Sequence, residues 1–490
     1  MNEETNIFDF IYPKYKISKK IKLIELFGGY GSQYLSLKYI GANVEHHKLV
    51  EWAAKSIQAY NDLHIQDYTD YSKNLTDDEV IDKIVEYGVS LDYNKPATRE
   101  QIKRQKYRTI YNNIIATNNL VDISRVNGKD LEINDKDNYE YILCYSFPCQ
   151  DLSSAGLGKG MSDTSTRSGL LWEVERILYE CKSLNQLPQI LLMEKVPQVH
   201  GSDNVKDFNK WQLSLEKLGY KNYWQDLMAT DYGIPQTRNR CFMVSILGDY
   251  SYTFPNTMPL GLKLKDILED KVDEKYYLSD KQIKDVQGWK AYQKPLETMK
   301  QIEKNGLSPT LTTRSGAYAA GMILVNQEYV GTYQYAKSDN FMQGKSRLQI
   351  GKDVSDTLQT SQKEGIVVLE EPKVIGGIGE KKSNGGTQWY QQDRVYDNKV
   401  GIIITTCSNP YYVDKKYRIR KLTPKEAFRL MGLKDEDIFK ISKKQTDNSL
   451  YHLAGDSIVT NCLCAILSKL IGINWEEKFK PNEWWNNDSN

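Results

Sequence analysis

The chain has 490 residues, of which 40% are hydrophobic and 26% charged, a composition typical of a globular protein large enough for two or three domains. No apolar run approaches the roughly 18 residues of a membrane-spanning helix, and the N-terminal segment lacks the layout of a signal peptide. The net charge of +1 neither supports nor excludes a nucleic-acid partner, because basic residues can gather on one face. Seven cysteines without paired CxxC spacing argue against a disulfide framework and a zinc site, so we expect a cytoplasmic protein with no metal and no membrane contact.

The first half of the chain alternates short apolar runs with helical stretches, a pattern typical of a parallel sheet covered by helices. The nearly continuous apolar character of the runs indicates strands buried on both faces. Glycines and a helix ending near Gly41 follow the first of them. The expected strands are Ile21–Phe27, Val44–Val50, Tyr141–Phe147, Ile190–Met193 and Cys241–Leu247.

Residues 62–118 interrupt this alternation with a polar, helical insert. Thr76 and Glu79 have the spacing of a capping box before an apolar helical stretch, and Gly88 is a suitable end of that helix. We interpret the insert as a surface elaboration of the sheet.

From residue 248 to residue 418 the sequence becomes rich in Gly, Thr and Ser, with short β-prone pieces such as Met322–Val325 and Gly365–Leu369. An imperfect repeat indicates stacked β units, although chance similarity among Thr-rich strands is the alternative. Arg347 and Arg394 precede the last two copies at the same offset of 47 residues. The three copies are Ser308–Thr313, Ser355–Thr360 and Gly401–Thr406.

A glycine-rich turn, Gly28-Gly29-Tyr30-Gly31, follows the first strand and precedes a helix, where the backbone can approach a ligand closely. Tyr34 stands where a dinucleotide-binding turn would want glycine. Glu51 comes 20 residues after Gly31 at the end of the next strand, where its carboxylate can accept both hydroxyls of a ribose, and Trp52 beside it can stack on adenine. Asp122-Ile123 could meet the adenine edge, so the features favour an adenosyl cofactor without a pyrophosphate.

Cys149 lies just past a buried strand, in Pro148-Cys149-Gln150, and enters a Gly- and Ser-rich loop. Substrates bind at this end of an α/β sheet, and a thiolate there would be a strong nucleophile, whereas an isolated cysteine such as Cys144 is more often a buried structural residue. Glu194 ends another apolar strand and is a candidate general acid. Arg238 and Arg240, at alternate positions, can face one side of an extended chain and contact phosphate or carbonyl groups, although each residue alone could serve a surface ion pair.

In this order the motifs resemble those of the DNA cytosine-5 methyltransferase family, over most of the chain outside the insert and the repeats. The chain departs from the family pattern at Glu25 for Asp, Ser32 for Gly, Gln33 for Phe, Lys195 for Asn and Asp456 for Asn. The matching segments are Glu25–Gln33, Glu51-Trp52, Pro148–Gln150, Arg167–Glu173, Glu194–Val196, Gln236–Arg240, Arg420–Glu426 and Gly455–Val459.

The resemblance implies S-adenosyl-L-methionine as cofactor and Cys149, Glu194, Arg238, Arg240 and Gln150 as catalytic residues. It implies that Cys149 adds to carbon 6 of a flipped-out cytosine while Glu194 engages nitrogen 3, with the loop from Gln150 to Ser168 as a lid. DNA contacts would come from Ser153, Arg238, Arg418 and Arg420, the last two in a basic run that is otherwise a solvated face. Cofactor contacts would come from Phe27, Gly29, Tyr30, Gly31, Ser32, Glu51, Trp52, Asp122, Ile123, Pro148, Leu170 and Ser457.

The implied fold is α/β, a Rossmann-like S-adenosylmethionine-dependent methyltransferase sheet with a second, β-rich target-recognition domain. We expect residues 1–247 to form the catalytic domain with the insert at about 62–118, 248–418 the target-recognition domain, and 419–490 a segment that returns to the sheet. The expected partner of this monomer is double-stranded DNA with a short specific site, with a cognate restriction endonuclease as a further candidate.

Other cytosine or base-modifying chemistries fit the motifs less well. A zinc deaminase would need a second cysteine after Pro148-Cys149, and an amino-methyltransferase would need a second proline where Asn409-Pro-Tyr-Tyr412 stands. A tRNA cytosine-5 methyltransferase and a catalytically impaired DNA-binding homologue, given Lys195 and Asp456, both stay open.

Overall fold

The computed structural model describes residues 12–147, 167–277 and 422–485, together with the backbone of short strands between residues 322 and 420. The chain divides into two compact units. The first comprises residues 1–234, 239–260 and 431–486, and the second residues 235–238, 261–430 and 487–490. Residues 431–486 therefore belong to the same unit as the N-terminal half of the chain.

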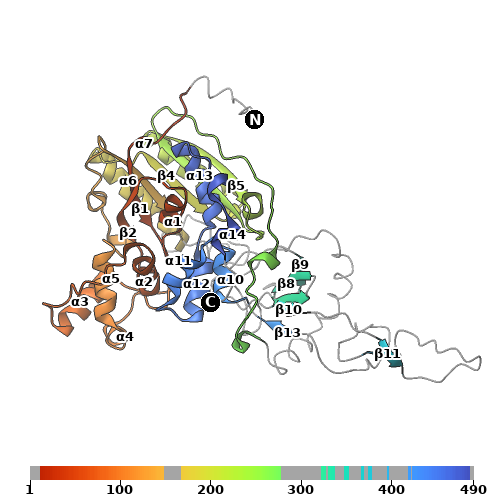
Figure 1. The fold of residues 1–490 in the computed structure, drawn as a ribbon. Helices are drawn as coiled ribbons and strands as arrows, with labels where there is room; N and C mark the ends of the chain where they lie inside the picture. Colours follow the sequence, from red (N-terminus) through yellow and green to blue (C-terminus); the bar gives the residue numbers. More distant parts are fainter. Residues whose placement is uncertain are drawn as a thin grey trace, which may run out of the picture. The chain divides into compact units, whose positions relative to one another are not determined.

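The first unit is built on a six-stranded sheet with the order β2-β1-β3-β4-β6-β5 (Figure 1). Strands β1 to β4 run parallel, and β6 runs antiparallel to both β4 and β5. The strands are β1 Lys20–Leu26, β2 Val44–Val50, β3 Tyr139–Tyr145, β4 Ile190–Lys195, β5 Tyr220–Met228 and β6 Asn239–Leu247.

The expectation of a purely parallel sheet is wrong at its far edge. Strand β6 returns antiparallel because only residues 229–238 separate it from β5, too few for the crossover that parallel strands need. Strand β5 was not predicted, since its middle residues are half-buried or exposed and give no apolar run. Each of the other strands overlaps its expected range, and β2 matches its range at both ends.

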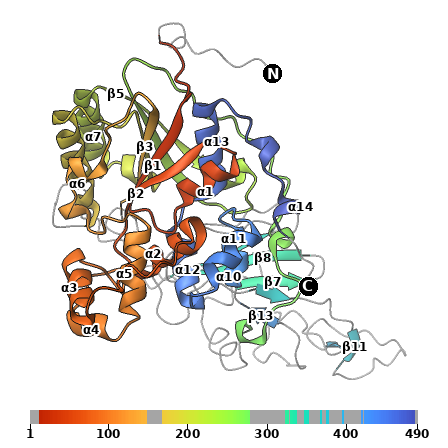
Figure 2. The same cartoon turned by 60° about the vertical axis from the view of Figure 1, so that its left-hand side comes forward.

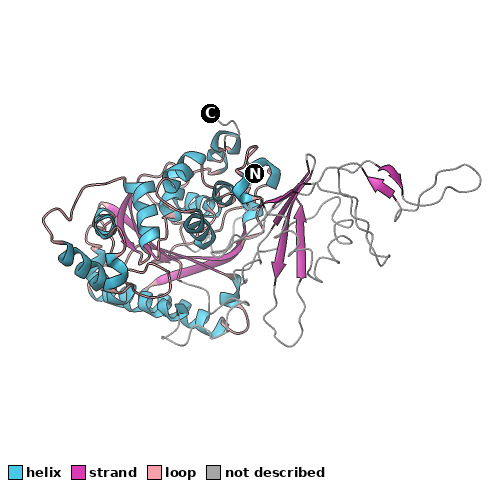
Figure 3. Cartoon of the chain, turned by 90° about the horizontal axis from the view of Figure 1, so that it is seen from below, coloured by secondary structure: helices cyan, strands magenta, loops and turns pink. Residues whose placement is uncertain are grey.

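Helices cover both faces of this sheet, with α6 Leu171–Ser183 and α7 Val205–Leu218 on one face and α1 Ser32–Tyr39 and α13 Thr460–Ile471 on the other (Figures 2 and 3). The face under α6 and α7 carries a large apolar core that includes Tyr145, Trp211 and Met243. Helix α1 lies against α13, where Ser36 Oγ donates to the Thr460 carbonyl at 3.3 Å. The C-terminal segment therefore forms part of the layer beside the glycine-rich turn.

The insert is helical, as expected, and has a core of its own. After α2 Ala54–Tyr60 the chain forms a π-helical turn, Asn61–Ile65, and then helices α3 Asp77–Tyr87, α4 Arg99–Lys103 and α5 Tyr107–Ala116. Buried residues of these helices, among them Ile84 and Ile114, pack together with Ile57 of α2, and Trp52 packs against this cluster.

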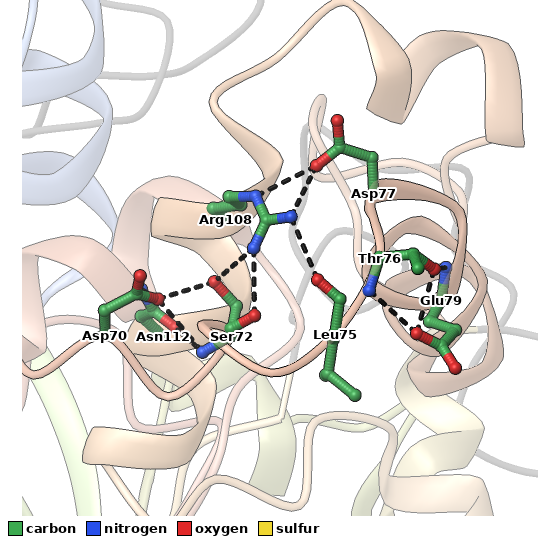
Figure 4. Close-up of polar contacts among 8 residues, drawn as sticks. All are labelled: Asp70, Ser72, Leu75, Thr76, Asp77, Glu79, Arg108 and Asn112. Carbon is green, nitrogen blue, oxygen red and sulfur yellow. Dashed lines mark hydrogen bonds and ion pairs between the residues drawn. The ribbon is translucent and has the colours of Figure 1, made fainter.

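The predicted capping box is present at the start of α3 (Figure 4). Thr76 Oγ1 accepts from the Glu79 N–H at 3.3 Å, the Thr76 N–H donates to Glu79 Oε2 at 2.7 Å, and Gly88 ends the helix with φ 78°. Arg108 of α5 closes the same region, donating to Asp77 Oδ1 and to the carbonyls of Ser72 and Leu75.

The second unit contains a five-stranded sheet, β13-β10-β7-β8-β9, and a two-stranded sheet, β11-β12. Its β-rich character agrees with the sequence, and β7 and β10 coincide with the two apolar runs named above. The repeat copies Ser308–Thr313, Ser355–Thr360 and Gly401–Thr406 lie outside the described residues. The elements are β7 Met322–Asn326, β8 Tyr329–Ala336, β9 Arg347–Lys352, β10 Ile366–Val368, β11 Val374–Gly377, β12 Arg394–Tyr396, β13 Arg418–Arg420 and α10 Pro424–Arg429.

Helices α11 Asp435–Ser442, α12 Asp447–Asp456 and α14 Pro481–Trp484 complete the C-terminal segment of the first unit. In the described part of the chain, no single helix has the length and apolar composition to cross a membrane. Helices α12 and α13 meet that test only as a pair, bent by 41°.

Candidate active site

The candidate site lies where strands β1 to β4 end. Because these strands are parallel, their carboxyl ends meet at one edge of the sheet, where ligands bind in open α/β folds. The turn after β1, Glu51 after β2, Ser146 after β3 and Glu194 within the last residues of β4 all belong to this edge.

The turn after β1 has a constrained backbone. Phe27 has φ 58° and Gly29 has φ 57°, both in the left-handed region. That conformation is unusual for an aromatic residue, and the surrounding structure must hold it at a cost of about 1–3 kcal/mol. The Phe27 N–H donates to the Val50 carbonyl at 2.7 Å, and a Cβ on Gly29 would meet nothing within 4 Å. The turn is thus anchored to β2 while Gly29 faces open space.

A pocket with about 420 Å³ of empty volume adjoins this turn. The lining residues expected from the sequence are Phe27, Gly29, Tyr30, Ser32 and Ser457. The sequence analysis did not assign Gly28, Gln33, Ser56, Ser146, His452, Leu453, Asp456 and Ile458, which also line the pocket.

The C-terminal end of α12 thus provides much of the pocket wall. Asp456 is half exposed, and His452 Nδ1 lies 3.0 Å from Asp456 Oδ2. The His452 ring stacks on Tyr93 of the insert with 3.7 Å between ring centroids. A carboxylate beside apolar and backbone surface suits a ligand that carries a positive charge and an apolar body.

Glu51 is buried behind the turn. Its two carboxylate oxygens accept from the Gly29 N–H at 2.9 Å and the Ala53 N–H at 2.7 Å, and Asn119 holds its backbone on both sides. Burial raises the pKa of the Glu51 carboxyl to about 7, against the lowering effect of the two N–H donors. Glu51 therefore braces the turn through Gly29, and its predicted contact with a ribose stays a prediction.

The remaining expected cofactor residues that the structure describes are not among the pocket-lining residues. Trp52 packs on the core of the insert, Leu170 packs on the core under α6, and Ile123 is buried in that same core. Asp122 caps a short 3-10 turn, Ile123–Arg125, by accepting from the Ser124 N–H at 3.0 Å. Gly31 faces the end of α2, where an added Cβ would lie 2.6 Å from Tyr60 Cε2.

The carboxylate of Glu194 has two polar partners in the first unit. Arg240 Nε of β6 lies 3.0 Å from Glu194 Oε1, and Ser146 Oγ donates to Glu194 Oε2 at 2.6 Å. The Glu194 side chain is 9% exposed, so little water competes with these contacts. Ser146 also lines the pocket, so one hydroxyl connects the pocket with the candidate acid.

Lys195, the residue that replaces the family's Asn, is buried, and its ammonium donates to the Phe147 carbonyl and lies 3.9 Å from the Phe147 ring centroid. The lysine therefore holds the backbone immediately before Pro148. The buried Cys144 has a pKa raised well above its usual value by desolvation, as expected of a structural cysteine.

Several predicted site residues are not among those that the structure describes. Pro148, Cys149, Gln150 and Ser153 lie outside the described residues, and so do Gly156, Gly158 and Gly160 of the predicted lid. Arg418 and Arg420 are the ends of β13, described by its backbone alone.

The arginine motif is divided between the units. Arg238 is buried and belongs to the second unit, where its neighbour Gln236 donates to the Leu430 carbonyl at 2.7 Å. Arg240 belongs to the first unit.

One group of possible metal ligands exists among the described residues: the ligand atoms of His200, Asp226 and Cys241 lie within 4.8 Å of one another. His200 Nε2 already contacts both Asp226 oxygens, at 3.0 and 3.1 Å. Burial, with Asp226 nearby, raises the pKa of the Cys241 thiol, which disfavours the thiolate that a metal would bind.

Comparisons with known proteins match this chain to methyltransferases. A family model described as C-5 cytosine-specific DNA methylase matches residues 94–472. The Type II methyltransferase M2.ScrFI of Lactococcus lactis subsp. cremoris is 30% identical over 457 residues, covering 92% of this chain and 99% of that protein. The orphan methyltransferase M.SssI of Spiroplasma monobiae is 35% identical over 272 residues, covering 54% and 68% of the two chains. Likeness of this extent along the chain is enough to assign the family.

Proposed function

Since this chain belongs to the C-5 cytosine-specific DNA methylase family, we propose that Cys149, Glu194 and Arg240 perform its reaction at the end of β4 and the start of β6. The protein is a DNA (cytosine-5-)-methyltransferase, which transfers a methyl group from S-adenosyl-L-methionine to carbon 5 of cytosine.

The pocket beside the glycine-rich turn suits the cofactor. Phe27 and Ile458 offer apolar surface to an adenosyl group, and the Asp456 carboxylate can attract the positive charges of the methionine end. When bound, S-adenosylmethionine supplies a methyl group on a sulfonium, which carbon 5 of an activated cytosine can accept. Glu51 would reach the ribose from behind Gly29.

The chain's own residues must activate the base, because carbon 5 of cytosine is a poor nucleophile. The Cys149 thiolate adds to carbon 6 and a proton at Glu194 passes to nitrogen 3, which makes carbon 5 electron-rich. After methylation carbon 5 loses its proton to solvent water, and the bond between sulfur and carbon 6 breaks, which restores the thiolate. Nitrogen 3 returns its proton to the Glu194 carboxylate, so the acid is ready for the next cycle. The cytosine must leave the duplex for this addition, which costs a few kcal/mol of stacking and pairing.

The observation that supports this assignment best is the position of Glu194. Its carboxylate is oriented on one side by Arg240 and on the other by Ser146, which itself lines the cofactor pocket. An acid so held lies beside the place where the methyl donor would bind. The Arg240 guanidinium, which uses Nε for Glu194, has further N–H groups that could hold the carbonyl oxygen of the base. Arg238 would contact a phosphate or the catalytic loop.

Target recognition is proposed for residues 248–418. The β-rich character of the second unit supports loops that project into a DNA groove, with Ser153, Arg418 and Arg420 as further DNA contacts. We propose that the protein acts as a monomer, in the cytoplasm, on a short specific sequence of double-stranded DNA. A relative named as a Type II methyltransferase suggests a cognate endonuclease, whereas a relative named as an orphan methyltransferase suggests none.

The test compares wild type with Cys149→Ser on unmethylated duplex DNA and on tRNA, using labelled methyl groups. Wild type should label duplex DNA and not tRNA, and Cys149→Ser should bind DNA with unchanged affinity but transfer no label. Cys181→Ser changes a buried thiol of α6 outside the site and should keep full activity. Normal turnover by Cys149→Ser would refute the covalent route, and labelling of tRNA alone would favour the tRNA alternative.

A further inference from the structure

Gly31 of the glycine-rich turn is not among the pocket-lining residues and lies against the start of the insert. Gly31 has φ 84°, and a Cβ built there would lie 2.5 Å from His64 Nε2 and 2.6 Å from Tyr60 Cε2. A side chain at this position would therefore collide with two rings. Glycine is required here by close packing as well as by backbone conformation.

The close approach brings the His64 ring within hydrogen-bonding distance of the backbone of the turn. Its Nε2 lies 2.9 Å from the Tyr30 carbonyl and 3.1 Å from the Gly31 carbonyl. Both partners are acceptors, so Nε2 must carry the proton. His64 Nδ1 lies 3.5 Å from Lys38 Nζ, which can donate to it, and burial lowers the pKa of His64 well below its usual value. The ring is thus neutral and donates to two consecutive carbonyls of the turn.

Neighbouring residues hold His64 in this position. The residue lies in the π-helical turn Asn61–Ile65, a rare element that is frequent at functional sites. Asn61 ties this turn to the insert, because its Nδ2 donates to Asn113 Oδ1 of α5 at 2.9 Å. The His64 ring also packs on Tyr34 and Tyr60, with centroid distances of 4.9 and 4.7 Å.

We propose that His64 is a positioning residue for the cofactor turn, so that the insert helps to set the affinity for S-adenosylmethionine. The turn is held from two sides: Glu51 binds the Gly29 N–H, and His64 binds the carbonyls of Tyr30 and Gly31. Tyr30, Gly29 and Ser32 line the pocket, so a shift of these carbonyls would displace its wall. The inference rests on the proposed assignment of the pocket to the cofactor.

The experiment measures S-adenosylmethionine binding to the full chain by calorimetry, beside thermal unfolding. His64→Leu removes the donor at similar volume and should weaken binding about tenfold, the loss expected for one net hydrogen bond. His64→Gln can place an amide N–H near Nε2 and should recover most of the affinity. The turnover rate at saturating cofactor should change little, so the effect should appear in KM for the cofactor and not in kcat.

His47→Leu is the matched control, since His47 Nε2 also contacts a backbone carbonyl, that of Leu131 at 2.9 Å, away from the turn. It should lower the melting temperature without changing cofactor affinity. Unchanged affinity in His64→Leu, an equal loss in His47→Leu, or no recovery in His64→Gln would overturn the inference. Phe27→Ala tests the pocket itself: if it leaves binding intact, the pocket assignment is wrong, whatever His64 does.

Discussion

Ser146 offers the sharpest test of the proposed catalytic arrangement, because one hydroxyl joins the pocket to Glu194. Replacing Ser146 with Ala removes the 2.6 Å hydrogen bond to Glu194 Oε2 and leaves the Arg240 contact on the other oxygen. A hydrogen bond to a charged group contributes about 1.5–3 kcal/mol, and the 9% exposed carboxylate has little water to replace it. If that stabilisation acts mainly in the transition state, methyl transfer should slow by about 10- to 150-fold.

Single-turnover methyl transfer with both substrates saturating measures this effect directly. The matched control is Ser245→Ala, since Ser245 is also buried in the sheet and its Oγ donates to Asn222 Oδ1 at 2.7 Å, outside the site. Ser146→Ala should keep its cofactor affinity within about threefold, less than the loss of one net hydrogen bond. If it transfers methyl groups at the wild-type rate, or if Ser245→Ala loses as much, the proposed orientation of Glu194 is wrong.

Two further predictions concern the buried carboxylate and the insert. Because burial raises the pKa of Glu51 to about 7, the ionised acceptor becomes protonated as pH falls from 8 to 6, and cofactor affinity should fall with it. Glu51→Gln should bind more weakly than wild type at pH 8, about as weakly as wild type at pH 6, and without this pH dependence. A wild-type affinity that is flat across this range would contradict the role of Glu51. Thr76→Ala removes the capping box of α3 and should lower the free energy of unfolding by about 1 kcal/mol. The melting temperature should fall while the rate of methyl transfer stays unchanged. A large loss of activity would show that this end of the insert takes part in the reaction.

Local sequence was sufficient to predict the bounds of a single strand or helix. The predicted strand Val44–Val50 is β2 from end to end, and the Thr76, Glu79 and Gly88 signals bound α3, because these patterns depend on neighbours a few residues away. Strand β5 escaped prediction since it lies at the edge of the sheet, where most of its residues are half-buried or exposed. The direction of β6 follows from the short connection to β5, which could not be recognised before β5 itself was known.

The sequence by itself determined the ordered motifs, and with them the family, the cofactor and the expected nucleophile, since these depend on residue types and spacing. Only the tertiary structure could bring Ser146 to Glu194, Asp456 to the glycine-rich turn, and His64 to the carbonyls of Tyr30 and Gly31. These pairs are separated by up to hundreds of residues, and no local pattern encodes which surfaces meet when parallel strands and their helices pack. Within the first unit, the packing of strands and helices decides which donor meets which acceptor.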